Sequence, residues 1–208
     1  MSEAMDPEAG PGLDADALAW DKQAGLLPAI VQDAATHRVL MLGYMDREAL
    51  ATTLRTGLVT FHSRSRQRQW TKGETSGNVL ELVVVEADCD ADTLLVRALP
   101  RGPTCHLGRD SCFADAGYSV LADLDRVVDG RARARPPGSY TTSLFDAGVR
   151  RIAQKVGEEG VETALAAVAQ DDDALLGEAA DLAYHLLVLL RARGLGLPDL
   201  ERVLRTRM

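Results

Sequence analysis

The chain has 208 residues, enough for one large domain or two small ones. Hydrophobic residues make up 46% of it and charged residues 26%, a composition that excludes disorder over the whole chain. Its formal net charge is -8, because 31 acidic residues outnumber 23 lysines and arginines, and this argues against a general nucleic-acid or anionic-membrane binder. A protein of this charge that handles phosphates needs local basic clusters or bound cations.

The first residues and the cysteines indicate a cytoplasmic protein. Residues 1–12 are acidic and rich in Gly and Pro, with neither the basic start nor the apolar core of a signal peptide, so we expect a mobile leader there. No apolar run approaches the roughly 20 residues that span a bilayer. The three cysteines, an odd number, are expected to be reduced thiols rather than a disulfide framework.

Residues 13–130 predict an α+β domain built mainly of antiparallel strands. Asp46 is a candidate cap for a helix that begins at Arg47 and ends at Gly57, where a left-handed residue would stop it. Apolar, β-rich runs separated by short polar connections predict strands over residues 27–32, 38–44, 58–63, 78–86 and 93–99.

The composition changes at residues 131–138, a basic run followed by Pro-Pro-Gly that predicts a linker. Beyond it, over residues 139–208, apolar residues recur at helical spacing and predict an all-α helical bundle. Turns are expected near residues 170–173 and 194–198. The chain is therefore expected to hold two domains of different architecture.

Three aspartates alternate with other residues at Asp88, Asp90 and Asp92. On an extended segment their carboxylates would point to one face, about 6 to 7 Å apart, while Cys89 would point to the other. Hard oxygen ligands of this kind suit Mg²⁺. Composition alone favours the alternative of an acidic turn with hydrated side chains.

The cysteines are candidate zinc ligands. Three thiolates, from Cys89, Cys105 and Cys112, could hold zinc with a bound water whose pKa would fall towards about 7. Their spacing matches no short C-x-x-C pattern, and three buried free cysteines are an equally good interpretation. His106 could be a fourth ligand, a proton carrier or an ordinary hydrogen-bonded histidine.

Residues 63–78 place four cations and several hydroxyl groups around a glycine-bearing loop. In an acidic protein this segment is the natural candidate for phosphate binding, because guanidinium groups and backbone amides both bind phosphate oxygens. A solvated basic hairpin is the alternative, especially for Arg66 and Arg68.

Together, Arg64 and the runs at 70–78, 88–92 and 105–112 resemble phosphoribosyl-AMP cyclohydrolase of histidine biosynthesis, a resemblance that covers about residues 20–118. It implies zinc on the three cysteines, magnesium on the three aspartates, and a homodimer whose zinc ligands come from both subunits. Water would then open the adenine ring between N1 and C6, with His106 as the proton carrier. The residues expected to bind this substrate are Arg64, Trp70, Lys72, Gly73, Thr75 and Ser76.

A second acidic cluster is expected in the helical tail. Glu158 and Glu162 lie one helical turn apart, and Glu159 comes three residues before Glu162. Glu178 and Asp181 repeat this i, i+3 relation on the next predicted helix. Like charges about 5 Å apart repel by about 3 kcal/mol per pair at an effective dielectric constant near 20, so such a cluster between packed helices needs cations. A hydrated acidic face is the better interpretation for either helix alone.

With Arg150 and Lys155, residues 157–162 and 178–187 resemble phosphoribosyl-ATP pyrophosphohydrolase, a match that runs from about 139 to 205. The resemblance implies that Mg²⁺ neutralises the triphosphate and orients a water for attack between the α and β phosphates. It assigns catalysis to Glu159 and Glu162 and substrate binding to Lys155. The implied magnesium ligands are Glu158, Glu159, Glu162, Glu178 and Asp181.

The sequence thus predicts a two-step hydrolase. The tail would convert phosphoribosyl-ATP to phosphoribosyl-AMP and pyrophosphate, and the first domain would open the ring of that product. Its partners would be these small nucleotides and a second subunit, with no nucleic acid or membrane. One alternative is a non-catalytic, zinc-stabilised interaction module with a helical dimerisation tail. Another is a general nucleoside-triphosphate pyrophosphohydrolase fused to an inactive domain.

Overall fold

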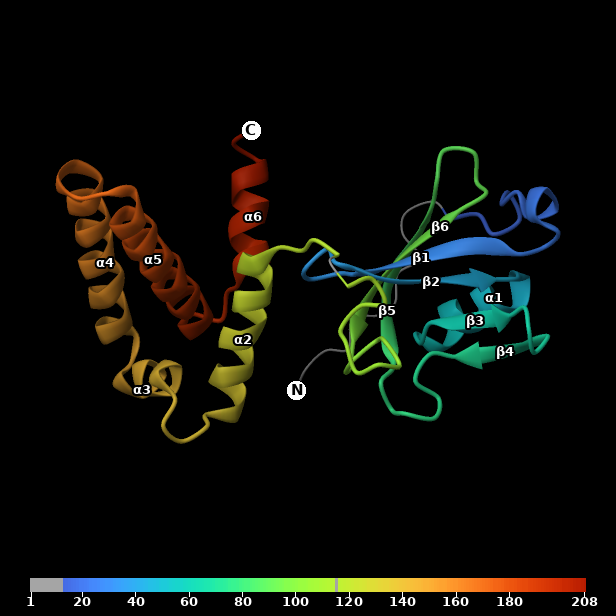
Figure 1. Cartoon of the computed structure of the whole chain (residues 1–208), viewed down its shortest axis with the longest axis horizontal. Helices are drawn as coiled ribbons and strands as arrows, with labels where there is room; N and C mark the ends of the chain where they lie inside the picture. Colours follow the sequence, from blue (N-terminus) through green and yellow to red (C-terminus); the bar gives the residue numbers. More distant parts are fainter. Residues whose placement is uncertain (1–12, 115) are drawn as a thin grey trace. The chain divides into compact units, whose positions relative to one another are not determined.

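The computed structural model describes residues 13–114 and 116–208 and divides the chain into two units, with the boundary between Ser119 and Val120 (Figure 1). The leader expected over residues 1–12 lies outside the described residues. Among the helices of the described ranges, none combines the length and the apolarity needed to cross a bilayer.

The first unit is built on a four-stranded sheet with the strand order β2-β1-β6-β5, beside a separate β3–β4 hairpin (Figure 1). β1 pairs antiparallel with β2, and β5 pairs antiparallel with β6, whereas β1 and β6 run parallel. The sheet is therefore mixed, although most of its pairings are antiparallel as predicted. In chain order the elements are the 3-10 helix η1 (Trp20–Gln23), β1 (Leu27–Asp33), β2 (Val39–Met45), α1 (Arg47–Thr56), β3 (Thr60–Ser63), β4 (Arg68–Thr71), β5 (Leu80–Ala87) and β6 (Leu94–Pro100).

The local signals in the sequence explain why these elements form. Every second residue of β1 is buried, and Leu27 and Val31 are fully inaccessible in the core. At the start of α1, Asp46 Oδ1 accepts a hydrogen bond from Ala49 N at 2.7 Å, and Gly57 ends the helix with φ at 69°. The helix predicted from Arg47 to Gly57 is confirmed.

The second unit is entirely helical among its described residues, as predicted. The main cluster of buried residues in this unit is small and consists of Val128, Leu144, Ile152 and Val188. The two longest helices, α4 and α5, pack against each other along most of their length (Figure 1). The helices are α2 (Val120–Ala134), α3 (Tyr140–Ala147), α4 (Val149–Ala169), α5 (Asp172–Ala192) and α6 (Leu197–Arg205).

The predicted domain boundary at residue 130 and the linker over 131–138 differ from the structure. Residues 131–134 are the last turn of α2, which belongs to the helical unit. Arg191 of α5 pairs with Asp125 at 3.1 Å and with Asp129 at 3.2 Å, and Val128 lies in the core. Arg131 and the other cations of this run sit at the C-terminal end of a helix, where positive charge is favourable.

This correction predicts how the chain can be divided. A fragment of residues 120–208 is expected to fold, whereas residues 136–208 are expected to lose a cooperative transition in thermal unfolding followed by circular dichroism. The shorter fragment loses the burial of Val128, worth about 2 kcal/mol, and leaves Arg191 without its partners at a cost of about 1 to 3 kcal/mol. Equal melting temperatures for the two fragments would contradict this account.

Candidate functional site

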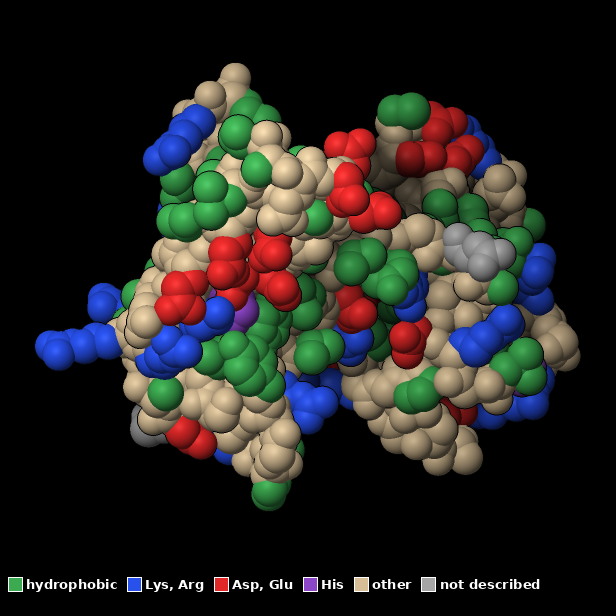
Figure 2. All heavy atoms as spheres, turned by 60° about the vertical axis from the view of Figure 1, so that its left-hand side comes forward, with side chains coloured by type: hydrophobic (Ala, Val, Ile, Leu, Met, Phe, Trp, Pro, Cys, Tyr) green, Lys and Arg blue, Asp and Glu red, His purple; other side chains and the backbone are tan. Residues whose placement is uncertain are grey.

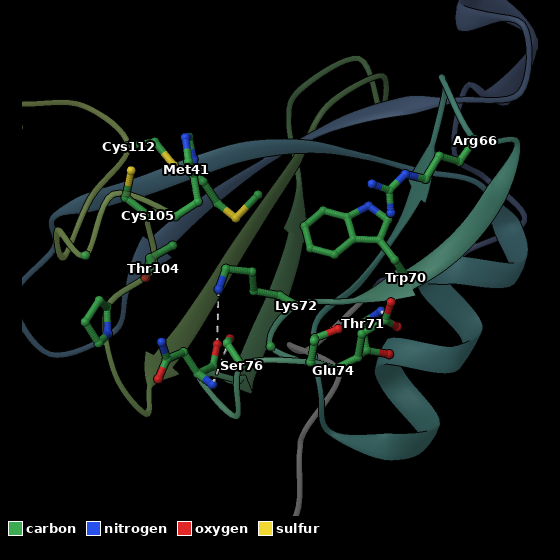
Figure 3. Close-up of a pocket in the computed structure, with 16 residues that line it drawn as sticks. Met41, Arg66, Trp70, Thr71, Lys72, Glu74, Ser76, Thr104, Cys105 and Cys112 are labelled. Carbon is green, nitrogen blue, oxygen red and sulfur yellow. Dashed lines mark hydrogen bonds between the residues drawn. The ribbon is translucent and has the colours of Figure 1, made fainter.

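A pocket of about 720 Å³ opens in the first unit, between the end of β4 with its following loop and the loop after β6 (Figure 3). Figure 3 shows Trp70 on one side, the two cysteines on the other, and Lys72 between them. Arg64 is not among the lining residues, because its guanidinium lies 3.8 Å from the centre of the Tyr44 ring. The predicted site residues that line the pocket are Trp70, Lys72, Gly73, Thr75, Ser76, Cys105, His106 and Cys112.

The loop after β4 is shaped by a glycine and a lysine. Gly73 has φ at +85°, and a side chain at this position would overlap the backbone of Asn78. Lys72 Nζ donates a hydrogen bond to Asn78 O at 3.1 Å, which holds the two ends of the loop together (Figure 3). Burial lowers the pKa of Lys72, because the pocket wall removes water from the ammonium group.

Trp70 is held by packing from the core. Its ring lies 5.2 Å from that of Phe61, centre to centre, and Phe61 is completely buried. A side chain at Gly43 of β2 would overlap the Phe61 ring, so only glycine allows this approach. The shape of the pocket therefore depends on a half-buried glycine that does not line it.

Cys105 and Cys112 lie together at the pocket, because the loop after β6 is attached to β2. Cys112 N donates to Leu40 O at 2.8 Å. A hydrogen bond from the backbone at Leu107 lowers the pKa of Cys105, and Arg109, 4.0 Å from its sulfur, contributes to this shift. Burial raises the pKa of Cys112, as does the neighbouring Cys105. Of the two thiols, Cys105 therefore loses its proton more readily.

Cys89 lies elsewhere in the chain. It is exposed in the turn between β5 and β6, whereas Cys105 is buried at the pocket. Within residues 13–114 and 116–208, the groups of three or more His, Cys, Asp or Glu whose ligand atoms converge within 4.8 Å contain no cysteine. One chain therefore brings together two of the three predicted zinc ligands.

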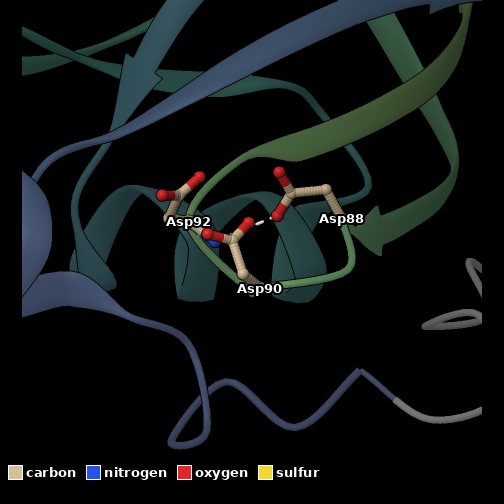
Figure 4. A group of neighbouring side chains, drawn as sticks. All are labelled: Asp88, Asp90 and Asp92. Carbon is tan, nitrogen blue, oxygen red and sulfur yellow. Dashed lines mark hydrogen bonds between the residues drawn. The ribbon is translucent and has the colours of Figure 1, made fainter.

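The three aspartates of the β5–β6 turn do converge (Figure 4). One carboxylate oxygen from each of Asp88, Asp90 and Asp92 lies within 4.8 Å of the others. The expectation of an extended segment is wrong, because Ala91 is left-handed with φ at 59° and Asp88 Oδ1 accepts hydrogen bonds from the backbone of Asp92 and Thr93 at 3.0 and 3.1 Å. A tight turn, rather than strand alternation, groups the carboxylates.

A second group of carboxylates lies between α4 and α5. Oxygens of Glu159, Glu178 and Asp181 lie within 4.8 Å of one another, and only 4% of Glu159 is exposed. Burial raises the pKa of Glu162, and the charges of Glu159 and Glu178 add to this effect. Figure 2 shows acidic side chains gathered on the surface of the helical unit next to basic side chains and a histidine.

Two of the predicted magnesium ligands, Glu162 and Glu158, do not belong to the converging group among the described residues. Glu158 interacts with side chains of its own helix instead. Its carboxylate accepts a hydrogen bond from Gln154 at 2.8 Å and pairs with Lys155 at 3.0 Å and Arg151 at 3.5 Å. Lys155 also lies 2.6 Å from Glu159, and this hydrogen bond lowers the pKa of that carboxyl group.

His185 and Tyr140 also contribute to this site, although they were not predicted as site residues from the sequence. His185 is buried, with Nδ1 2.8 Å from Asp181 O and 3.7 Å from Glu159 Oε1, and Nε2 3.1 Å from the Tyr140 hydroxyl. The position of His185 one helical turn after Asp181 was an available signal. Nothing in the local pattern connects Tyr140 to the cluster, because it comes from α3.

The fold and the two sites define a two-domain enzyme with a separate reaction centre in each domain. A family model described as phosphoribosyl-AMP cyclohydrolase matches residues 41–114, and one described as phosphoribosyl-ATP pyrophosphohydrolase matches residues 121–208. The chain belongs to the bifunctional family that joins these two domains, and it is a hydrolase of histidine biosynthesis.

Similar proteins carry both domains along most of their length. A protein of Xanthomonas axonopodis pv. citri is 68% identical over 190 residues, which cover 91% of this chain and 92% of the relative. One of Escherichia coli strain K12 is 56% identical over 192 residues, covering 91% and 95%. Both are named histidine biosynthesis bifunctional protein HisIE. The predicted family and its two activities are confirmed.

Proposed function

We propose that the first unit opens the adenine ring of phosphoribosyl-AMP at a zinc site formed by Cys89, Cys105 and Cys112. The observation that carries this proposal is that Cys105 and Cys112 both line a pocket that Lys72 also lines. Thiolates are preferred zinc ligands, and the lowered pKa of Cys105 makes its thiolate easier to form than that of an ordinary cysteine. When bound, zinc would polarise a water and make it nucleophilic at neutral pH.

The pocket residues have distinct roles in this reaction. The ammonium of Lys72 and the hydroxyls of Thr75 and Ser76 bind a phosphate of the substrate, and Gly73 lets the backbone approach it. Trp70 packs against the planar base. Water adds its oxygen to C6 while the N1–C6 bond breaks, and His106, exposed at the pocket, delivers the proton to N1.

We also propose that the zinc site is shared across a homodimer. Cys105 and Cys112 leave two of the four positions of a tetrahedral zinc site to other groups. Cys89 is exposed in its turn, so it is accessible to a second copy of the chain. A two-fold axis would then create two equivalent sites, each with Cys89 from one subunit and the other two cysteines from its partner.

In the second unit we propose that Glu159, Glu162, Glu178 and Asp181 hold Mg²⁺ for pyrophosphohydrolysis. The support is a converging cluster of carboxylates, of which Glu159 is buried and Glu178 half-buried, that need cations to offset their repulsion. When bound, magnesium would neutralise the triphosphate and orient the attacking water. Lys155 would bind a phosphate, and Glu159 and Glu162 would accept the proton of the water that attacks between the α and β phosphates.

The remaining proposals concern the aspartate turn and the location. We propose Asp88, Asp90 and Asp92 as a magnesium site of the first unit, supported by their convergence within 4.8 Å. We further propose that the chain works in the cytoplasm. Its three cysteines are free thiols, the state that this compartment maintains and that zinc binding requires.

Metal analysis combined with both assays tests the proposed zinc site. We expect one zinc ion per chain, and we expect its removal by a chelator to abolish ring opening of supplied phosphoribosyl-AMP. Pyrophosphate release from phosphoribosyl-ATP should continue when Mg²⁺ is added back, because the helical cluster uses oxygen ligands. Full ring opening by zinc-free enzyme would refute the proposal.

A further inference from the structure

A lysine from outside the β5–β6 turn reaches into the aspartate cluster. Lys22, in η1, places its Nζ 2.6 Å from Asp90 Oδ2 and 3.3 Å from Asp92 Oδ2. The same ammonium lies 3.5 Å from the carbonyl oxygen of Asp90. A positive charge therefore already sits among the carboxylates that the proposed function gives to Mg²⁺.

The position of this ammonium is set by the fold. Ala19 N donates a hydrogen bond to Ala91 O at 2.8 Å, which joins the start of η1 directly to the turn. Trp20 is 4% exposed, and its indole nitrogen donates to Ala15 O at 2.9 Å. These hydrogen bonds fix the backbone just before Lys22, so the Lys22 side chain extends toward the turn from a fixed position.

The three aspartates differ in their contact with Lys22. Asp88 Oδ1 already accepts two backbone hydrogen bonds within the turn, at 3.0 and 3.1 Å. Asp90 and Asp92 instead have the ammonium of Lys22 as their cationic partner. Asp88 thus stabilises the turn itself, whereas the other two carboxylates are balanced by a group that can move away.

We propose that Lys22 is the counter-cation of the metal-free aspartate cluster and that it leaves Asp90 and Asp92 when a divalent cation binds. This inference rests on the proposed magnesium site of the first unit. A divalent cation at the converging oxygens would need the atoms that the ammonium now contacts, and two cations at one position repel each other. Lys22 therefore lowers the affinity of the cluster for the metal and keeps the empty turn folded.

Removing the charge of Lys22 tests this competition. In the full chain, with the helical cluster silenced by Glu178→Gln, we expect Lys22→Gln to bind Mn²⁺ about threefold more tightly than the Lys22 parent does. The probe is Mn²⁺ alone, measured by calorimetry at fixed ionic strength. Without metal, the Lys22→Gln protein should melt at a lower temperature than its parent, and saturating Mn²⁺ should remove that difference.

Arg47→Gln is the matched control. Arg47 lies near the same short helix, 5.3 Å from the Trp20 ring, and pairs with Asp16 at 2.9 Å, but no ion pair joins it to the aspartate cluster. The Arg47→Gln change also removes one positive charge, but away from the aspartates, so the Mn²⁺ affinity of this variant should equal that of the parent. Lys22→Arg keeps the charge and should also retain the parent affinity. An equal gain in Arg47→Gln and Lys22→Gln would mean a general charge effect and would overturn the inference.

The test also separates this inference from the site on which it rests. If Asp90→Asn abolishes Mn²⁺ binding in the same background but Lys22→Gln leaves the affinity unchanged, the metal site stands and the role of Lys22 is wrong. If Asp90→Asn leaves Mn²⁺ binding intact, the proposed magnesium site is wrong, and the inference fails with it.

Discussion

Replacing Cys105 by serine in the full chain is expected to slow ring opening of phosphoribosyl-AMP by more than about a hundredfold. The loss of a directly bound ligand should exceed the 10- to 100-fold cost typical of removing an outer partner of a metal site. Pyrophosphate release from phosphoribosyl-ATP should stay at the wild-type rate, because Cys105 lies in the first unit and the carboxylate cluster in the second. Parallel assays and zinc analysis of one preparation measure all three effects.

The unaffected second reaction is the internal control for folding. Serine is close to cysteine in size, so loss of both activities with a normal circular dichroism spectrum would contradict two independent sites. Retention of zinc and of ring opening together would show that Cys105 is not a ligand.

Cys89→Ser extends this prediction to the shared site. Cys89→Ser and Cys105→Ser should each abolish ring opening on their own, although Cys89 and Cys105 lie apart in one chain. When equal amounts are mixed under conditions that exchange subunits, half of the dimers should be hybrids, and each hybrid should contain one complete site. About a quarter of the wild-type activity should therefore return. No recovery in proven hybrid dimers would place all zinc ligands within one chain.

The elements with strong local signals were predictable from the sequence. An apolar run followed by a short polar connection predicts β1, and an Asp cap with a Gly at the end predicts the bounds of α1. The parallel pairing of β1 with β6 was not predictable in this way. It joins residues more than 60 positions apart, and the local sequence of neither strand indicates its partner. Local pattern gives the elements, and nonlocal packing decides which strands become neighbours.

Helix α2 was missed for a different physical reason. Its last turn carries Arg131 and Arg133, and Pro136 follows it, so the composition resembles that of a linker. The same features suit the end of a helix, where cations interact favourably with the dipole and proline stops propagation. The pairing of Arg191 with Asp125 and Asp129, together with the burial of Val128, distinguishes the two interpretations.

The candidate sites were predicted well where their residues are close in sequence. The carboxylates of α4 and α5 follow helical spacing, and three of the five expected magnesium ligands converge as a group. The contact of Lys22 with Asp90 was not predictable, because 68 positions separate the two residues in the sequence. The place of Tyr140 in the site was not predictable either, because its hydroxyl reaches the site from another helix. Side chains that complete a site from distant elements are visible only after folding.

Replacing Glu159 by glutamine is expected to slow pyrophosphate release from phosphoribosyl-ATP by more than about a hundredfold, at saturating Mg²⁺. Glutamine keeps the shape of the side chain but removes the charge from the most buried member of the carboxylate group. It also leaves Lys155 with Glu158 as its remaining acidic partner on α4. Ring opening of supplied phosphoribosyl-AMP should be unchanged, because that pocket belongs to the first unit.

Substitutions at two further glutamates serve as controls for the Glu159→Gln prediction. Glu201→Gln on α6 makes the same chemical change at a surface pair with Arg205, and it should leave both activities at the wild-type rate. Glu158→Gln should have a smaller effect than Glu159→Gln, since the Glu158 carboxylate already interacts with Gln154, Lys155 and Arg151. If Glu158→Gln and Glu159→Gln were equally damaging, the metal would also depend on Glu158, and the group of Glu159, Glu178 and Asp181 alone would not explain catalysis.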